Sequence, residues 1–250
     1  MEGMILAAGL GTRLGTLTDD VPKALIEVGG KPLLAWVMGC LVEAGVTRII
    51  VNIHHHEEQI RSYLQRSTPP GVEVVFSPEP DEPLETGGGL FQAAPLFQEK
   101  EPFLLHNADV LSSIPLGKLY DQHVGRGKEV GERLIASLAV QNRESRRALL
   151  FDDGGLMGWE NLGTHQTPGG RKTVREPVGE IKRWSFTGIH VVDPAIFRLS
   201  ERTGAFSIIT LYLELAAQGW MIDPLDVSQE EWMDIGTPER LQEARRRYSP

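Results

Sequence analysis

The chain has 250 residues, of which 41% are hydrophobic and 24% are charged, and its formal net charge is −9 at pH 7. This length and composition predict a single domain over 1–250, and the acidic balance argues against nucleic acid and anionic membranes as partners, since both need a broad basic surface. The single cysteine excludes a disulfide framework, and no apolar run reaches the roughly 18 residues of a membrane span, so we expect a cytoplasmic protein.

Apolar runs alternate with helical patterns through the first half of the chain. Buried strands are predicted at 4–8, 48–53, 72–77 and 102–106, because these runs are mostly apolar on both faces. Helices are predicted between and after them, at 32–44, 57–66 and 88–97. This order predicts an α/β fold with a doubly wound, mostly parallel central sheet, whose ligands bind at the carboxyl ends of the strands.

The second half of the chain is less regular and predicts an added β region. Strands are expected at 134–141, 148–151 and 181–192, with a hairpin turn at 152–155. Helices are expected at 207–218 and 238–248. The segment 161–177 has almost no apolar residues and therefore predicts a mobile, exposed loop.

The loop after the first strand contains glycines that favour a phosphate site. Gly9 and Gly11 would let backbone N–H groups approach phosphate oxygens without a side chain between them. The P-loop pattern is excluded, because Gly15 is followed by Thr16 rather than by lysine. The dinucleotide fingerprint needs glycine or alanine at the position of Leu14, so a nicotinamide dehydrogenase is a poor second choice.

Two cations, Arg13 and Lys23, belong to this loop in an otherwise acidic chain. The spacing Gly11-Thr12-Arg13, followed by Pro22-Lys23, resembles the signature of the sugar-1-phosphate nucleotidyltransferases, also called nucleotide-sugar pyrophosphorylases. The resemblance implies a Rossmann-like fold and the transfer of a nucleoside monophosphate from a nucleoside triphosphate to a sugar 1-phosphate, with release of pyrophosphate. It also implies catalytic roles for Arg13, which would contact the leaving pyrophosphate, and for Lys23, which would contact the phosphates near the reacting centre.

The same resemblance implies which residues hold the nucleotide. The expected residues in the loop and at the neighbouring strand ends are Leu6, Ala7, Ala8, Gly9, Gly11, Thr12 and Asn107. In the segment PLETGGGLF, at 83–91, we expect exposed N–H groups of Gly87 and Gly88 to read the base, with Glu85 or Thr86 beside them, since glycines are costly in a helix. This segment most resembles that of the N-acetylmuramate-1-phosphate uridylyltransferases of cell-wall recycling, which implies UTP.

Two aspartates are candidate ligands for Mg²⁺, which prefers one or two carboxylates together with phosphate oxygens and water. Asp109 follows the strand predicted at 102–106, and Asp234 precedes Thr237-Pro238, a helix start with an N-cap and a proline at the first position. Both resemble the two metal-binding aspartates of the family, at strand ends where a doubly wound sheet places its ligands.

The resemblance places the sugar 1-phosphate over the second half of the chain, 134–250, and leaves 1–133 mainly to the nucleotide. In the segment SFTGIHV, Thr187 and Gly188 resemble the family strand whose glycine lets the sugar lie close. The Glu-Lys-Pro motif that precedes this strand in many relatives is absent, and Lys182 or Glu180 is the candidate that remains for the sugar phosphate.

Two alternatives stay open at this point. The same fold could use GTP or CTP, as mannose-1-phosphate guanylyltransferases and phosphocholine cytidylyltransferases do. A catalytically inactive, nucleotide-binding regulatory module belongs to a different class, and the joint presence of Arg13, Lys23, Asp109 and Asp234 argues against it. We expect a monomer or a small homo-oligomer.

Overall fold

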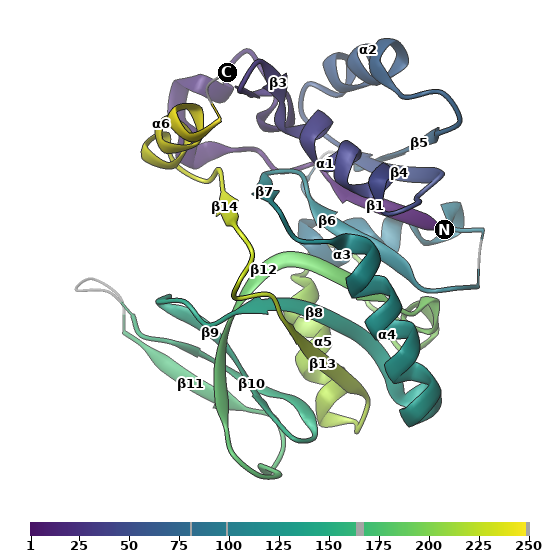
Figure 1. Ribbon diagram of the computed structural model, residues 1–250, viewed down its shortest axis with the longest axis vertical. Helices are drawn as coiled ribbons and strands as arrows, with labels where there is room; N and C mark the ends of the chain where they lie inside the picture. The colour runs from purple at the N-terminus through teal and green to yellow at the C-terminus, as the bar shows by residue number, and fades with distance from the viewer. Residues whose placement is uncertain (81, 99, 164–167, 249–250) are drawn as a thin grey trace.

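Four parallel strands form the centre of the fold in the computed structural model, which describes residues 1–80, 82–98, 100–163 and 168–248. They are β1 (Glu2–Leu6), β4 (Arg48–Ile53), β5 (Glu73–Pro78) and β6 (Phe103–Asn107). Their order in space is β6-β1-β4-β5, so the chain first moves outward from β1 and then returns to its other side (Figure 1). This reversal is a topological switch point, where the loops after β1 and β6 separate and leave room for a ligand.

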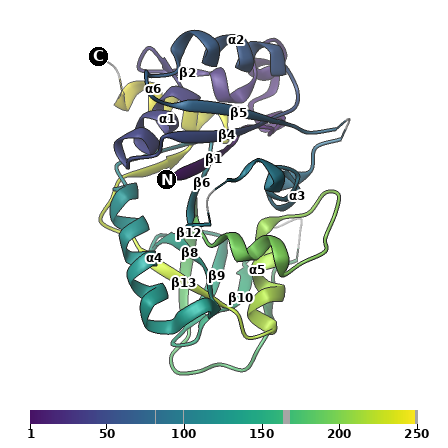
Figure 2. The same cartoon turned by 90° about the vertical axis from the view of Figure 1, so that its right-hand side faces the viewer.

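Helices cover both faces of the sheet, as the alternation in the sequence predicts (Figure 2). One face carries α1 (Leu33–Glu43), α2 (Glu57–Ser67) and α4 (Leu116–Val130), and the other carries α3 (Glu85–Gln92) and α5 (Ile208–Ala217). Successive residues of β1 supply the two cores, because Met4 belongs to the core under α3 and α5 and Ile5 to the opposite one. Within the described ranges, no helix combines the length and apolarity needed to cross a bilayer.

The helix α4 lies in a segment for which the sequence pattern predicts no element. Its 15 residues, LGKLYDQHVGRGKEV, include three glycines, which lower helix propensity. Its buried stripe is narrow and contains Leu116 and Leu119, which join the core that α1 and α2 also cover. The helix is therefore stabilised by packing on the sheet rather than by its local sequence.

The second half of the chain extends the sheet with mostly antiparallel strands. These are β8 (Leu134–Gln141), β9 (Arg147–Asp152), β10 (Gly155–Asn161), β11 (Gly170–Thr173), β12 (Lys182–Val192) and β13 (Met221–Asp226). The long strand β12 pairs antiparallel with β6, β8 and β9, and so joins the two halves of the chain, while β13 runs parallel to β8. The central strands are parallel as predicted, and the complete sheet is mixed.

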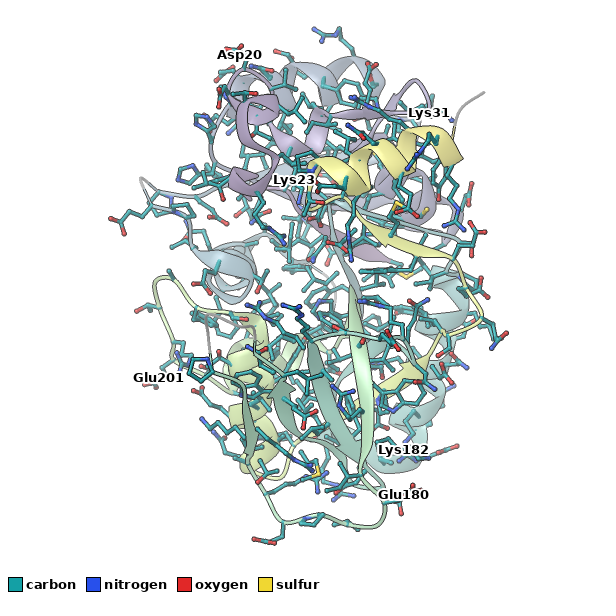
Figure 3. The ribbon with its side chains drawn as sticks, turned by 90° about the vertical axis from the view of Figure 1, so that its left-hand side faces the viewer. Asp20, Lys23, Lys31, Glu180, Lys182 and Glu201 are labelled. Atoms are coloured by element: carbon teal, nitrogen blue, oxygen red, sulfur yellow. The ribbon has the colours of Figure 1, made fainter. Side chains whose placement is uncertain are left out.

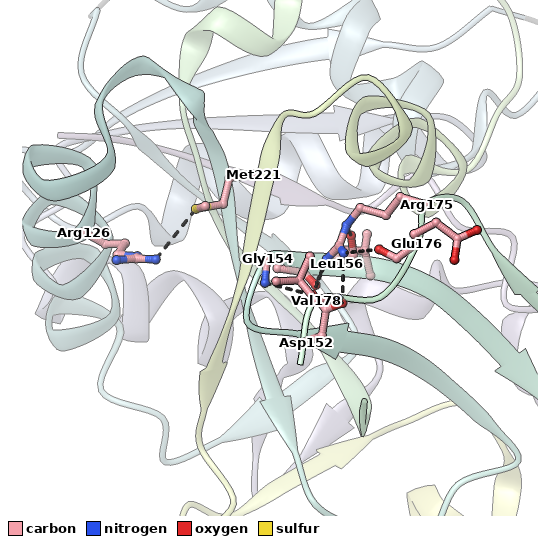
Figure 4. A network of polar contacts seen from close by, with 9 residues as sticks. Arg126, Asp152, Gly154, Leu156, Arg175, Glu176, Val178 and Met221 are labelled. Carbon is pink, nitrogen blue, oxygen red and sulfur yellow. Dashed lines mark hydrogen bonds and ion pairs between the residues drawn. The ribbon is translucent and has the colours of Figure 1, made fainter. Parts of the chain in front are cut away.

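The prediction of a loop over the whole of 161–177 is wrong where β11 pairs with β10. An antiparallel ladder satisfies its own backbone groups, so β11 forms although its residues are polar and exposed. The chain beyond β11 is anchored by Arg175, whose Nη1 donates to Asp152 Oδ2 at 2.9 Å, and by Val178, whose N–H donates to the same oxygen at 2.6 Å (Figure 4). The part of the predicted loop at 164–167 lies outside the described residues.

Short elements join the glycine loop to the end of the chain. The 3-10 turns η3 (Ala94–Leu96), η4 (Gly131–Arg133) and η5 (Pro194–Arg198) lie outside this group. The group comprises the 3-10 turns η1 (Thr12–Thr18) and η2 (Lys23–Leu25), the strands β2 (Glu27–Val28), β3 (Lys31–Pro32), β7 (Val110–Ser112) and β14 (Trp232–Asp234), and the helix α6 (Pro238–Arg247). A third core lies beneath them and includes Leu14, Ile235 and Leu241. The purple loop and the yellow helix α6 consequently lie together in Figure 1.

Candidate active site

A cleft of about 280 Å³ opens at the switch point, where the loop after β1 faces the carboxyl ends of β4, β5 and β6. Most of the residues that the sequence predicts for the nucleotide and for catalysis line it: Leu6, Ala7, Ala8, Gly9, Gly11, Thr12, Arg13, Lys23, Glu85, Asn107 and Asp109. Thr86, expected beside the glycines of α3, also lines it, together with residues that were not predicted for the site: Ala24, Asn52, Glu79, Pro83, Ala108 and Gly236.

The glycine loop turns sharply at Gly11, whose φ of +68° lies in the left-handed region. A Cβ at this position would lie 2.8 Å from Thr18 Cγ2 and 3.2 Å from Lys23 Cβ. Glycine is therefore what allows the segment that carries Lys23 to pack against the loop. The loop continues as 3-10 turns that are interrupted at Gly15, so no long helix follows β1.

Lys23 and Asp109 form an ion pair at the cleft. Pro22, with φ −62°, precedes the 3-10 turn that begins at Lys23, and this turn fixes the direction in which the lysine leaves the backbone. The two side chains are 13% and 23% exposed, so the pair is shielded from bulk water and yet accessible to a ligand. Lys23, predicted to be catalytic, thus lies beside Asp109, the first predicted metal ligand.

Asp234 reaches the same place from the far end of the chain. The strand β14 pairs antiparallel with β7, with Asp234 opposite Val110, and the N–H of Ile235 donates to the carbonyl oxygen of Asp109 at 2.8 Å. A Cβ at Gly236 would lie 2.8 Å from Asp234 Oδ2 and 3.0 Å from Arg13 Nη2. The small size of Gly236 therefore brings Arg13 and Asp234 together beside the cleft.

The two aspartates fit a magnesium ion that also binds substrate phosphates. Asp109 is paired with Lys23, and Asp234 is paired with Arg240, so each carboxylate lies beside a cation. Throughout the described part of the chain, no cluster of three or more His, Cys, Asp or Glu side chains could hold a metal by itself. Two carboxylates are nonetheless the number that Mg²⁺ commonly takes when phosphate oxygens and water complete its coordination.

A polar clamp that the sequence analysis does not anticipate supports the cleft. Asn52, at the end of β4 and only 2% exposed, accepts the N–H of Ala7 at 2.6 Å and that of Ala8 at 3.3 Å through Oδ1. Its Nδ2 donates to Glu79 Oε1 at 2.6 Å, and Glu79 Oε2 accepts the N–H of Leu84 at 2.8 Å. The signal in the sequence is a polar residue that follows three apolar ones in a strand buried on both faces.

The prediction of exposed N–H groups at Gly87 and Gly88 is wrong. Both groups donate to the carbonyl oxygen of Phe206, at 2.8 and 3.2 Å, because α3 begins at Glu85 and not at Gly88. A Cβ at Gly87 would lie 2.4 Å from the Phe206 ring, and one at Gly88 would lie 2.3 Å from the Gly204 carbonyl oxygen. The glycines are therefore explained by close packing of α3 on the loop before α5, which leaves Glu85 and Thr86 at the cleft.

The predicted sugar ligands do not reach the cleft as expected. Thr187 is 1% exposed, and its Oγ1 donates to the carbonyl oxygen of Ala139 at 2.7 Å, so its hydroxyl is already used. Gly188 has φ +84°, and a Cβ there would lie 2.6 Å from Asn107 Nδ2, so this glycine makes room for Asn107. Lys182 lies at the far end of the molecule from Lys23 (Figure 3), because β12 begins at the opposite end from the cleft.

The histidine next to the cleft is not an acid–base group. Burial lowers the pKa of His106 to about 4, although the Asn107 carbonyl and the charge of Asp109 act in the opposite direction. The imidazole is 1% exposed, with Nδ1 2.8 Å from the carbonyl oxygen of Asn107. His106 therefore stays neutral at pH 7 and supports the end of β6.

Proteins of known name resemble this chain over most of its length. The N-acetylmuramate alpha-1-phosphate uridylyltransferase of Neisseria meningitidis is 33% identical over 98% of this chain and 96% of its own. The mannose-1-phosphate guanylyltransferase catalytic subunit beta of Drosophila melanogaster is 29% identical over 95% of this chain and 60% of its own.

Solved structures share the fold. The crystal structure of a putative glucose-1-phosphate thymidylyltransferase from Bacillus anthracis matches 99% of this chain and 95% of its own, with a TM-score of 0.77 and 19% identity. The sequence profile of one family, described as nucleotidyl transferase, matches residues 2–166, which hold the glycine loop, both predicted catalytic cations and Asp109. The chain is therefore an enzyme of the nucleotidyl transferase family.

Proposed function

We propose that the protein transfers uridine monophosphate from UTP to a sugar 1-phosphate, with Mg²⁺, and so forms a UDP-sugar and pyrophosphate. The observation that carries the proposal is that Arg13, Lys23 and Asp109 line one cleft, with Asp234 beside Arg13, although these residues come from distant parts of the chain. The choice of UTP is supported by the N-acetylmuramate alpha-1-phosphate uridylyltransferase of Neisseria meningitidis, which matches over nearly the whole chain.

The reaction needs positioning and charge neutralisation more than proton transfer. A phosphate oxygen of the sugar 1-phosphate is already an anion at neutral pH, so it can attack the α-phosphorus of UTP without a general base. The barrier then comes from bringing two anions together in line and from the charge that spreads over the reacting phosphates.

Each site residue has a distinct part in this scheme. Arg13 binds the oxygens of the departing pyrophosphate, and Lys23 exchanges its ion pair with Asp109 for the triphosphate. A Mg²⁺ held by Asp109 and Asp234 would neutralise phosphate charge and fix the direction of the phosphate oxygens. The clamp formed by Asn52 keeps the backbone of the loop in place while these charges are exchanged.

The base is proposed to lie against the start of α3. Glu85 lines the cleft and has a φ of +59°, a conformation that costs a residue other than glycine about 1 kcal/mol or more. Glu85 thus occupies a position at which glycine would be less strained, which indicates that its side chain has a use there. The carboxylate can accept the N3–H of uracil, which supports Glu85 as the residue that reads the base.

The test is a matrix of the four common nucleoside triphosphates against a panel of sugar 1-phosphates, with pyrophosphate release as the readout and EDTA as a control. We expect turnover with UTP and at least one acceptor, at least 10-fold faster than with any other nucleotide, and loss of turnover in EDTA. A preference for GTP or CTP would overturn the choice of base. No pyrophosphate from any pair would overturn the reaction and favour a regulatory module.

A further inference from the structure

Arg143 lies in the turn between β8 and β9, with its guanidinium packed on the indole of Trp232. The distance from Arg143 Cζ to the ring centroid is 4.0 Å, which fits a cation–π contact. Its Nη2 donates to the carbonyl oxygen of Phe186 at 3.3 Å. The guanidinium is therefore held in a defined plane by an aromatic ring on one side and a strand on the other.

The Nε of Arg143 is buried and lacks a hydrogen-bond acceptor. Among the residues that the structure describes, it is the one buried side-chain nitrogen or oxygen in this condition. No carboxylate in the described ranges forms an ion pair with Arg143. Arg143 as a whole is half-buried, and a buried donor without an acceptor is costly, so this geometry points to a missing ligand that completes the guanidinium.

The position of Arg143 relates this missing ligand to the active site. Trp232 stands two residues before Asp234 on β14, and its Nε1 donates to the carbonyl oxygen of Thr187 at 2.8 Å, which fixes the ring. Arg240, the ion-pair partner of Asp234, is also close to Arg143. Burial lowers the pKa of Arg143, and the positive charge of Arg240 lowers it further. Arg240 thus lies close enough to Arg143 for their charges to interact, while it also pairs with Asp234.

We propose that Arg143 binds the phosphate of the acceptor sugar 1-phosphate, with Trp232 setting the plane of its guanidinium. This inference rests on the proposed function, in which the acceptor phosphate must reach the α-phosphorus of the nucleotide beside Asp234. Arg13 and Lys23 come from the glycine loop, whereas Arg143 follows β8 in the second half of the chain. Separate cations for donor and acceptor would hold two repelling anions in line.

Arginine suits this role better than the lysine that the sequence pattern favours. Lys182 lies at the far end of the molecule from the cleft, so its ammonium is remote from the reacting phosphates. Arg143 offers a planar fork of donors that matches two phosphate oxygens at once, and its stacking on Trp232 removes rotational freedom before the ligand arrives.

The first experiment compares steady-state kinetics of R143Q and R143K with the wild type. We expect R143Q to raise the KM for the sugar 1-phosphate about 10- to 100-fold and to leave the KM for UTP within twofold. R143K should restore only part of the loss, because it keeps the charge and loses the fork. The matched control is R133Q, which removes an exposed arginine just before β8, at the opposite end of this strand from Arg143.

The second experiment tests which anion Arg143 binds. N-acetylmuramate 1-phosphate carries a carboxylate besides its phosphate, and N-acetylglucosamine 1-phosphate does not. Equal losses with both acceptors in R143Q support the phosphate. A loss confined to the acceptor with the carboxylate would overturn this assignment, and so would an unchanged acceptor KM. Circular dichroism verifies folding, and if R143Q does not fold, R143K provides the same comparison.

A binding measurement separates this inference from the proposed function. Inorganic phosphate is titrated into the wild type, R143Q and R133Q without nucleotide, and binding is followed by calorimetry. We expect R143Q to bind at least 10-fold more weakly than the other two. Equal affinities would overturn the role of Arg143, whereas a wild type that binds phosphate and transfers no nucleotide would overturn only the proposed function.

Discussion

The polar clamp around Asn52 gives the sharpest stability prediction. Asn52→Leu removes the acceptor of the Ala7 N–H, 2.6 Å away, and the donor to Glu79 Oε1, also 2.6 Å away. A buried N–H left without a partner costs about 1–3 kcal/mol, and a lost hydrogen bond to a carboxylate costs about 1.5–3 kcal/mol. We expect the free energy of unfolding to fall by about 2.5–6 kcal/mol, a large part of the roughly 5–15 kcal/mol of a typical domain.

Asn52→Asp keeps the acceptor for the Ala7 N–H and removes the donor to Glu79, so it tests the two hydrogen bonds of the clamp separately. The introduced carboxyl can still accept the N–H of Ala7, and it faces the carboxylate of Glu79 where a donor stood. Burial and this like charge raise the pKa of the introduced carboxyl, so the folded chain binds a proton that the unfolded chain has released. Stability relative to the wild type therefore falls as pH rises, by up to about 1.4 kcal/mol per pH unit, until the folded chain also loses that proton.

Urea unfolding from pH 5 to pH 8 measures both effects. Gln65→Leu is the control, because Gln65 is exposed on α2 and its replacement should change the unfolding free energy by less than about 0.5 kcal/mol. The KM for UTP should also rise in both Asn52 variants, since the clamp holds the loop backbone. A deficit for Asn52→Asp that is small, or that is the same at every pH, would refute this account of the clamp.

Two further predictions concern packing and burial. Gly88→Ala should lower Tm by about 5–10 °C, because its Cβ would lie 2.3 Å from the Gly204 carbonyl oxygen. Gly39→Ala is the control and should leave Tm unchanged, because a Cβ there meets no atom within 4 Å. Equal melting temperatures for the two variants would contradict this reason for the glycine at 88. Burial lowers the pKa of His106 to about 4 and that of His190 to about 3, so below pH 6.5 only the unfolded chain binds these protons. Stability should fall by up to about 1.4 kcal/mol per pH unit for each histidine as pH drops from 6.5 toward 4, and a urea midpoint that stays flat over this range would exclude the linkage.

Most of the fold follows from local patterns in the sequence. The strands β4 and β8 begin and end where the apolar runs predict, and the N-caps Ser207 and Thr237 precede α5 and α6. The helix α4 does not follow from such a pattern, since its segment contains glycines and only a narrow apolar stripe, and it is helical through packing on the sheet. Local periodicity therefore predicts the elements that their own sequence favours, and it misses α4, which forms only through packing against its neighbours.

Sequence patterns likewise predict some residues of the candidate site and miss others. Arg13 and Lys23 could be found because they match the family signature in the loop after β1, and Asp109 because it comes just after the end of β6, where the topology places ligands. The exposure expected for the Gly87 N–H was wrong, because Phe206 fills the space beside this glycine, and the space at Gly188 is taken by Asn107. No spacing in the sequence indicates such contacts.

The most direct test of the central claim is the turnover of Asp109→Asn and Asp234→Asn, measured as pyrophosphate release with UTP and the best acceptor. Asp121→Asn, an exposed position on α4, is the control for loss of a negative charge. We predict that each active-site substitution lowers kcat by about 10²–10³-fold or more while circular dichroism shows a folded chain, and that the control keeps its full rate. Rates like those of the wild type in both variants would contradict the claim that these two carboxylates form the reaction centre.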